Sequence, residues 1–181
     1  MSPILGIIAS QNYSRVTDTG DMFPISTVTV GSGGAASVTF SSIPSTYTHL
    51  QIRITEAYSG SGFNPRVRFN SDTGSNYSWH YVLGDGSSAS AGAAANTTGM
   101  FLNSNTALST MTVHIIDILD YANINKNKTI RVLDGYDANG SGFIDLWSGN
   151  WRNTSAVTSI SIDAGTFAQY SSFALYGIKG A

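Results

Sequence analysis

Apolar and polar residues alternate with a period of two along most of this chain, which is the pattern of β-strands that bury one face. The clearest run is residues 47–55, where Leu50, Ile52 and Ile54 share one face and polar side chains share the other. Similar runs recur roughly every ten to fifteen residues, with turn-forming residues between them. The pattern predicts an all-β protein of about ten strands, without a convincing helix.

Turn-forming residues between such runs predict hairpins. The predicted hairpins join residues 25–30 to 35–40, 66–69 to 77–83, and 128–136 to 143–147. Residues 84–98 are rich in Gly, Ser and Ala and have no periodicity, so they predict a loop.

Residues 111–120 are apolar in both phases of a strand. Val113 and Ile115 belong to one phase, and Ile116 and Ile118 belong to the other. Such a run is typical of a strand covered on both faces, or of a bulge that switches the phase.

Together the runs predict an antiparallel two-sheet sandwich, jelly-roll-like, because that architecture holds eight or more strands around one core. We expect one domain over residues 21–181, preceded by an extended N-terminal arm over residues 1–20.

The first residues contain a short apolar stretch formed by Ile4, Leu5, Ile7 and Ile8. It lacks basic residues and is too short for a signal peptide or a membrane span. It predicts either an edge strand of its own domain or an arm that docks on a partner. In the second case, these four residues are the partner-binding residues.

The composition of the chain argues against several classes of function. Of 181 residues, 41% are hydrophobic and only 11% charged, the net charge is -2, and there is no Cys. The chain has no basic stripe for nucleic acid and no thiolate for disulfides or metals. The three histidines, His49, His80 and His114, each fall inside a predicted strand without a marked nucleophile nearby. We therefore expect no catalytic residue, no enzyme activity and no cofactor.

One segment matches the first half of a calcium-binding loop, in which oxygen ligands alternate before a glycine. Its candidate ligands are Asp137, Asn139, Ser141 and Asp145. Position twelve, where such loops carry a bidentate acid, is Ser148. The pattern favours a plain β-turn over a metal site.

Aromatic residues suggest a second kind of site. Trp79, Trp147 and Trp151 could form a platform on which sugar rings stack. The alternative is that these rings fill the core or an interface, where large aromatics bury the most area.

Several segments resemble virion structural proteins of tailed bacteriophages. They are residues 27–36, 43–53, 67–70, 76–78, 117–123, 149–154 and 172–179, so the resemblance spans nearly the whole chain. It implies a capsid cement or decoration protein on the outer capsid surface, with the major capsid protein as partner and self-association as a homotrimer. The alternative is a tail-fibre or receptor-binding subunit that contacts host glycans. Neither implies a nucleic-acid or membrane partner.

Overall fold

The computed structural model describes residues 21–59, 64–103 and 110–180. Twelve strands among these residues pair in antiparallel fashion and form two sheets that pack as a sandwich, which confirms the predicted all-β, two-sheet fold. Within these ranges there is no helix long and apolar enough to cross a membrane. The predicted N-terminal arm, residues 1–20, lies outside the described residues.

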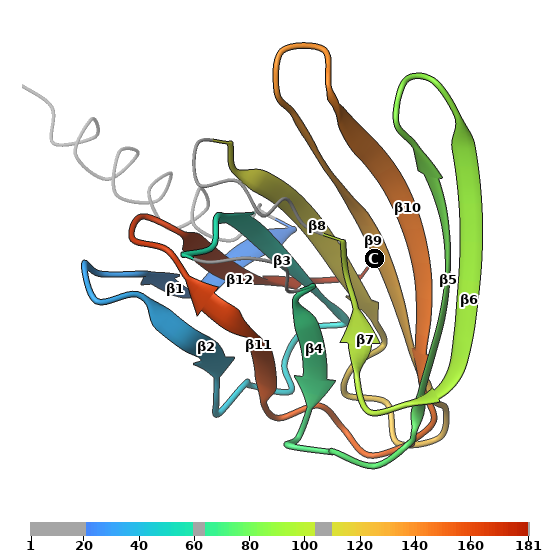
Figure 1. Ribbon diagram of the computed structural model, residues 1–181. Helices are drawn as coiled ribbons and strands as arrows, with labels where there is room; N and C mark the ends of the chain where they lie inside the picture. Colours follow the sequence, from blue (N-terminus) through green and yellow to red (C-terminus); the bar gives the residue numbers. More distant parts are fainter. Residues whose placement is uncertain (1–20, 60–63, 104–109, 181) are drawn as a thin grey trace, which may run out of the picture.

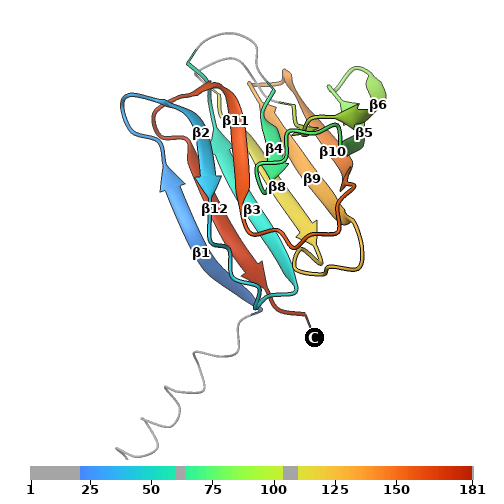
Figure 2. The ribbon, with the colours of Figure 1, turned by 90° about the horizontal axis from the view of Figure 1, so that it is seen from below.

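The larger sheet has eight strands and the smaller sheet has four (Figures 1 and 2). In spatial order the larger sheet contains β1 (Met22–Thr29), β12 (Ser172–Ile178), β3 (His49–Glu56), β8 (Thr112–Leu119), β9 (Lys128–Asp137), β10 (Gly142–Trp151), β5 (Tyr77–Gly84) and β6 (Ala89–Thr97). The smaller sheet contains β2 (Ala35–Phe40), β11 (Ile160–Phe167), β4 (Arg66–Phe69) and β7 (Met100–Phe101).

The hydrophobic core lies between the sheets and is built from alternate residues of each strand. In β3, Leu50, Ile52 and Ile54 all face inward and are fully buried, as the alternation predicts. Trp151 is also buried, and its indole Nε1 donates a hydrogen bond of 2.7 Å to Asp72. Burial of side chains of this size contributes roughly 1.5–3 kcal/mol each.

Two hairpins, β5–β6 and β9–β10, extend the larger sheet beyond the smaller one (Figure 1). The β9–β10 hairpin confirms the prediction for residues 128–147, and its register runs without a shift from Asp137 opposite Gly142 to Lys128 opposite Trp151.

The other two predicted hairpins are wrong. Strands β1 and β2 lie in different sheets, and so do β4 and β5. The turn residues between them do reverse the chain, but the chain also crosses from one sheet to the other.

The loop predicted for residues 84–98 is also wrong, because this segment contains the edge strand β6. Strand β6 pairs with β5 from Gly84 opposite Ala89 to Tyr77 opposite Thr97, with one irregularity near Asn96. Its residues are small, and most are exposed, so no apolar alternation marks the strand.

Strand β8 fits neither of the two expectations for residues 111–120. Its register with β3 and β9 is unbroken, so it contains no bulge. His114, Ile116 and Ile118 face the core, but no element among the described residues covers the opposite face, and Val113 is 47% exposed. The apolar residues of that second phase therefore lie on the surface.

Candidate functional site

The face of the larger sheet that points away from the smaller sheet carries a cluster of aliphatic side chains. We call it the outer apolar surface. Its residues are Val82 of β5, Val113 and Ile115 of β8, Leu133 of β9, and Ile144 and Leu146 of β10. Five of the six are between 46% and 62% exposed, and Ile115 is partly buried. Contiguous exposed apolar area of this kind marks interaction sites on soluble proteins.

Strand register makes these side chains neighbours. Ile115 lies opposite Leu133, Leu133 opposite Leu146, and Leu146 opposite Val82, so one aliphatic row crosses four strands. Adjacent strands are about 4.8 Å apart, which places the four side chains in contact range.

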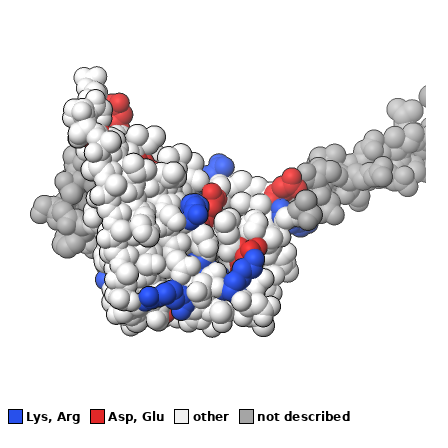
Figure 3. Space-filling view, turned by 90° about the vertical axis from the view of Figure 1, so that its right-hand side faces the viewer, with Lys and Arg blue, Asp and Glu red and all other residues white. Residues whose placement is uncertain are grey.

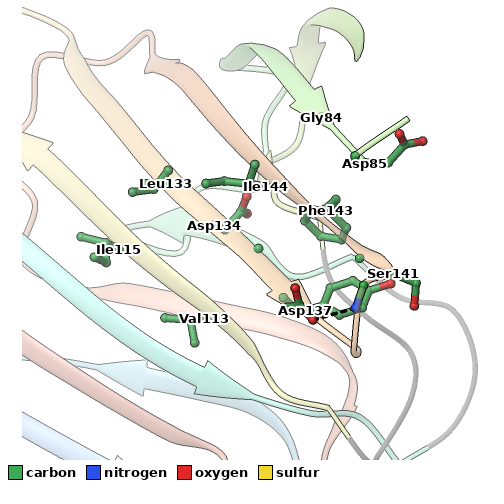
Figure 4. Close-up of a pocket in the computed structure, with 15 residues that line it drawn as sticks. Gly84, Asp85, Val113, Ile115, Leu133, Asp134, Asp137, Ser141, Phe143 and Ile144 are labelled. Atoms are coloured by element: carbon green, nitrogen blue, oxygen red, sulfur yellow. Dashed lines mark hydrogen bonds between the residues drawn. The ribbon is translucent and has the colours of Figure 1, made fainter. Parts of the chain in front are cut away.

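A hollow of about 500 Å³ opens on this surface near the turn of the β9–β10 hairpin. Figure 4 shows Val113, Ile115, Leu133 and Ile144 around it, on three neighbouring strands. Five of its lining residues are glycines, namely Gly84, Gly86, Gly135, Gly140 and Gly142. Their missing side chains leave space between the aliphatic groups that a partner's side chain can fill.

Polar residues border the outer apolar surface on the same sheet face. Arg131 of β9 donates a hydrogen bond of 2.7 Å to the Ser148 hydroxyl, and Gln51 donates one of 2.9 Å to Asp117. With exposed His80, they form a polar margin beside the aliphatic centre. Protein–protein interfaces commonly have this arrangement of apolar core and polar rim.

A second cluster, buried between the sheets, contains three ionisable groups. Both ring nitrogens of His114 lie 3.0 Å from carboxylate oxygens, Nδ1 from Asp134 and Nε2 from Glu56. The Tyr58 hydroxyl donates a hydrogen bond of 2.6 Å to the other oxygen of Glu56. The side chains of His114, Glu56 and Asp134 are 0% exposed.

The environment of His114 favours its charged form. Burial lowers the pKa of His114, but the hydrogen bonds and charges of Asp134 and Glu56 outweigh burial and raise this pKa to about 9. Burial also raises the pKa of Asp134, partly offset by His114 and Trp147. His114 is therefore an imidazolium that donates to both carboxylates.

This cluster, which we call the buried ion cluster, lacks two requirements for general base catalysis. Neither nitrogen of His114 is free to accept a proton, and no atom of the three side chains is open to a substrate. The arrangement instead ties β3, β8 and β9 together.

The predicted glycan platform is not formed. Trp147 and Trp151 are 2% and 1% exposed, so neither can offer a ring face to a sugar. The partly buried Trp79 packs against Trp147, with ring centroids 5.2 Å apart. The alternative interpretation, that these rings fill the interior, is correct for Trp147 and Trp151.

The candidate calcium ligands are not brought together. Asp137 caps the hairpin turn by accepting a hydrogen bond from the Gly140 amide, and Asn139 and Ser141 are exposed in the same turn. Asp145 is buried, and its carboxylate accepts a hydrogen bond of 2.6 Å from Asn103. The segment is a plain turn, and Asp145 belongs to the interior of the sandwich.

The predicted partner-binding residues Ile4, Leu5, Ile7 and Ile8 lie outside the described residues.

Two features of the structure, the outer apolar surface and the buried ion cluster, were not predicted from the sequence. The outer apolar surface was signalled by the second apolar phase of residues 111–120, whereas nothing in the sequence links Glu56, His114 and Asp134.

The sequence matches no protein-family model, and the comparisons with curated proteins and with solved structures found no match.

Proposed function

We propose that this protein is a structural protein of a bacteriophage virion, a capsid cement or decoration protein that binds the major capsid protein. The observation that carries the proposal is the outer apolar surface, an exposed aliphatic area bordered by polar residues. Its activity is binding to a protein lattice on the outer capsid surface. The resemblance of the sequence to phage virion proteins is the reason for proposing the major capsid protein as the protein that forms this lattice.

The strand order supports a jelly-roll interpretation of the sandwich. Without the hairpins β5–β6 and β9–β10, the sheets are β1-β12-β3-β8 and β2-β11-β4-β7. Eight strands divided into two such sheets are typical of jelly rolls, which occur in viral capsid proteins and also in lectins and cupins. Because this fold serves many functions, the surface has to carry the proposal.

The strength of binding can be bounded from the exposed side chains. Five half-exposed aliphatic residues gain roughly 1 kcal/mol each on complete burial, or about 5 kcal/mol together. Association itself costs about 4–15 kcal/mol, so the surface alone gives weak binding. We expect additional contacts from Ile4, Leu5, Ile7 and Ile8, and from simultaneous attachment of several copies.

Co-sedimentation with assembled heads tests the proposal. The protein is co-expressed with the major capsid protein of the genome that encodes it, and head-bound protein is quantified after centrifugation. We expect the wild type to sediment with heads and the double variant Leu133→Glu/Leu146→Glu to lose at least tenfold in occupancy. The control is Ile124→Glu, because Ile124 is 68% exposed but lies outside the outer apolar surface.

Absence of the wild type from sedimented heads would overturn capsid binding. Full occupancy by Leu133→Glu/Leu146→Glu would overturn the role of the outer apolar surface. A deletion of residues 1–12 in the same assay measures the contribution of the N-terminal arm. The alternative, a tail-fibre or receptor-binding subunit that contacts host glycans, is not supported by Trp147 and Trp151, because both are buried.

A further inference from the structure

Strand β6 forms one edge of the larger sheet and pairs only with β5 among the described residues. An edge strand exposes backbone N–H and C=O groups that can pair with another strand. Proteins usually block such edges with charged residues, proline, bulges or very short strands. The four edges of this sandwich differ in that respect.

The other three edges carry such features. Strand β1 contains Pro24 and a register shift beside it, and β7 has only two residues. Strand β2 has six residues, and its pairing with β11 is interrupted by a register shift between Asp163 and Phe167.

Strand β6 has nine residues, and its regular part, residues 89–95, contains only Ala, Ser and Gly. The sole Lys, Arg, Asp or Glu within residues 77–97 is Asp85, in the turn before β6. Figure 3 views the molecule from the side that carries β6, and its upper left part shows few charged side chains. The longest uncharged edge is thus the least protected.

We propose that β6 is an interface at which a second copy of this chain adds its own β6 in antiparallel orientation. The pairing continues the larger sheet across a twofold axis. With Gly92 opposite its own copy, Ala91 lies opposite Ala93, Ser90 opposite Ala94, and Ala89 opposite Ala95. Each of these pairs is small and uncharged, so the two edges approach without steric or electrostatic conflict.

The composition of β6 favours a second copy over an unrelated strand. Strand-addition partners are selected by pockets that receive alternate side chains. The small residues of β6 form few pockets that could receive a partner's side chains. An identical strand has equally small side chains and needs no such pockets. Antiparallel pairing of a strand with itself is isologous and closes at two copies. This assembly is therefore a dimer, whereas the resemblance to phage virion proteins implies a homotrimer.

The dimer also brings the two outer apolar surfaces to the same side. Ala91 is opposite Val82 and continues the row formed by Ile115, Leu133, Leu146 and Val82. In the joined sheet, the two rows are separated by two β6 strands of small residues. Dimerisation through β6 is a property of the purified protein and does not depend on capsid binding.

Light scattering coupled to size-exclusion chromatography tests the inference through mass. The chain has a mass of 19.1 kDa, so we expect the wild type to elute at twice that value. The double variant Ala91→Glu/Ala93→Glu places like charges opposite each other and is expected to halve the measured mass. The matched control, Ser37→Glu/Thr39→Glu, introduces the same charges on one exposed face of edge strand β2 and should remain dimeric.

Circular dichroism and thermal melting of both variants test whether they are folded. A cross-linking experiment covers the case in which the charged variant fails to fold. The chain contains no Cys, so oxidised Ala91→Cys/Ala93→Cys can form only the introduced bonds. We expect a covalent dimer. A monomeric or trimeric wild type, a charged variant that stays dimeric, or cysteines that do not cross-link would each overturn the inference.

Discussion

Replacement of His114 by Gln should remove much of the stability of this protein at neutral pH. The substitution leaves Glu56 and Asp134 as buried carboxylates without their cationic partner. Removal of one member of a buried ion pair costs about 3–5 kcal/mol. For a protein of this size, roughly 2–4 °C of melting temperature corresponds to each kcal/mol, so we expect a decrease of about 10 °C.

The same cluster predicts how stability depends on pH. Because Asp134 and Glu56 raise the folded-state pKa of His114 to about 9, whereas a free histidine has a pKa of about 6.5, the folded protein holds this proton more tightly than the unfolded chain. The resulting stabilisation is complete below about pH 6.5 and is lost as pH rises through 9. A difference of this size corresponds to roughly 3 kcal/mol. The raised pKa of Asp134 acts in the same direction.

Urea unfolding at pH 6, 7.5 and 9.5 measures both effects. We expect the wild type to lose stability from pH 6 to 9.5, and His114→Gln to show a weaker dependence over that range. The control is His80→Gln, because His80 is exposed on β5 and has no carboxylate partner among its described hydrogen bonds. A flat wild-type profile, or a His114→Gln variant as stable as the control at pH 7.5, would contradict the stabilising role of the buried ion cluster.

Two further substitutions test the packing and the hairpin. Trp151→Ala should lower the free energy of unfolding by about 3–5 kcal/mol, because it opens a cavity beneath the smaller sheet. Urea unfolding measures this change, and a loss of less than about 1 kcal/mol would contradict the prediction. Gly142→Ala should cost about 1–3 kcal/mol, since φ is +145° and a Cβ would lie 2.2 Å from the Tyr136 carbonyl oxygen. In the Gly142→Ala variant, hydrogen exchange should accelerate in the β9–β10 hairpin. The control is Gly84→Ala, where a Cβ meets no atom within 4 Å, and it should leave the exchange rates of this hairpin unchanged.

Alternation in the sequence was sufficient to predict the strands that bury one face. In β3 the apolar phase coincides with the core, because one face packs against the smaller sheet and the other meets water. The hairpin turn of residues 137–142 was likewise predictable, since its turn residues and flanking strands lie close in the sequence.

The pairing of β1 with β12 and of β2 with β11 was not predictable from the turn between β1 and β2. Turn chemistry specifies that the chain reverses, but the choice of sheet depends on strands more than a hundred residues away. Strand β6 was not predicted for a different reason. Its backbone pairs with β5, but its small side chains bury too little apolar surface to produce a periodic pattern in the sequence.

Composition and alternation along the chain were enough to predict an all-β protein that is poor in charge and contains no cysteine. The meeting of Glu56, His114 and Asp134 could be seen only in the folded structure. The same holds for the second apolar phase of β8, which joins residues of β9, β10 and β5 on a face that no described residue covers. Both outcomes depend on strand register across the larger sheet. Register arises from contacts between segments distant in the sequence, whereas composition and alternation are local properties.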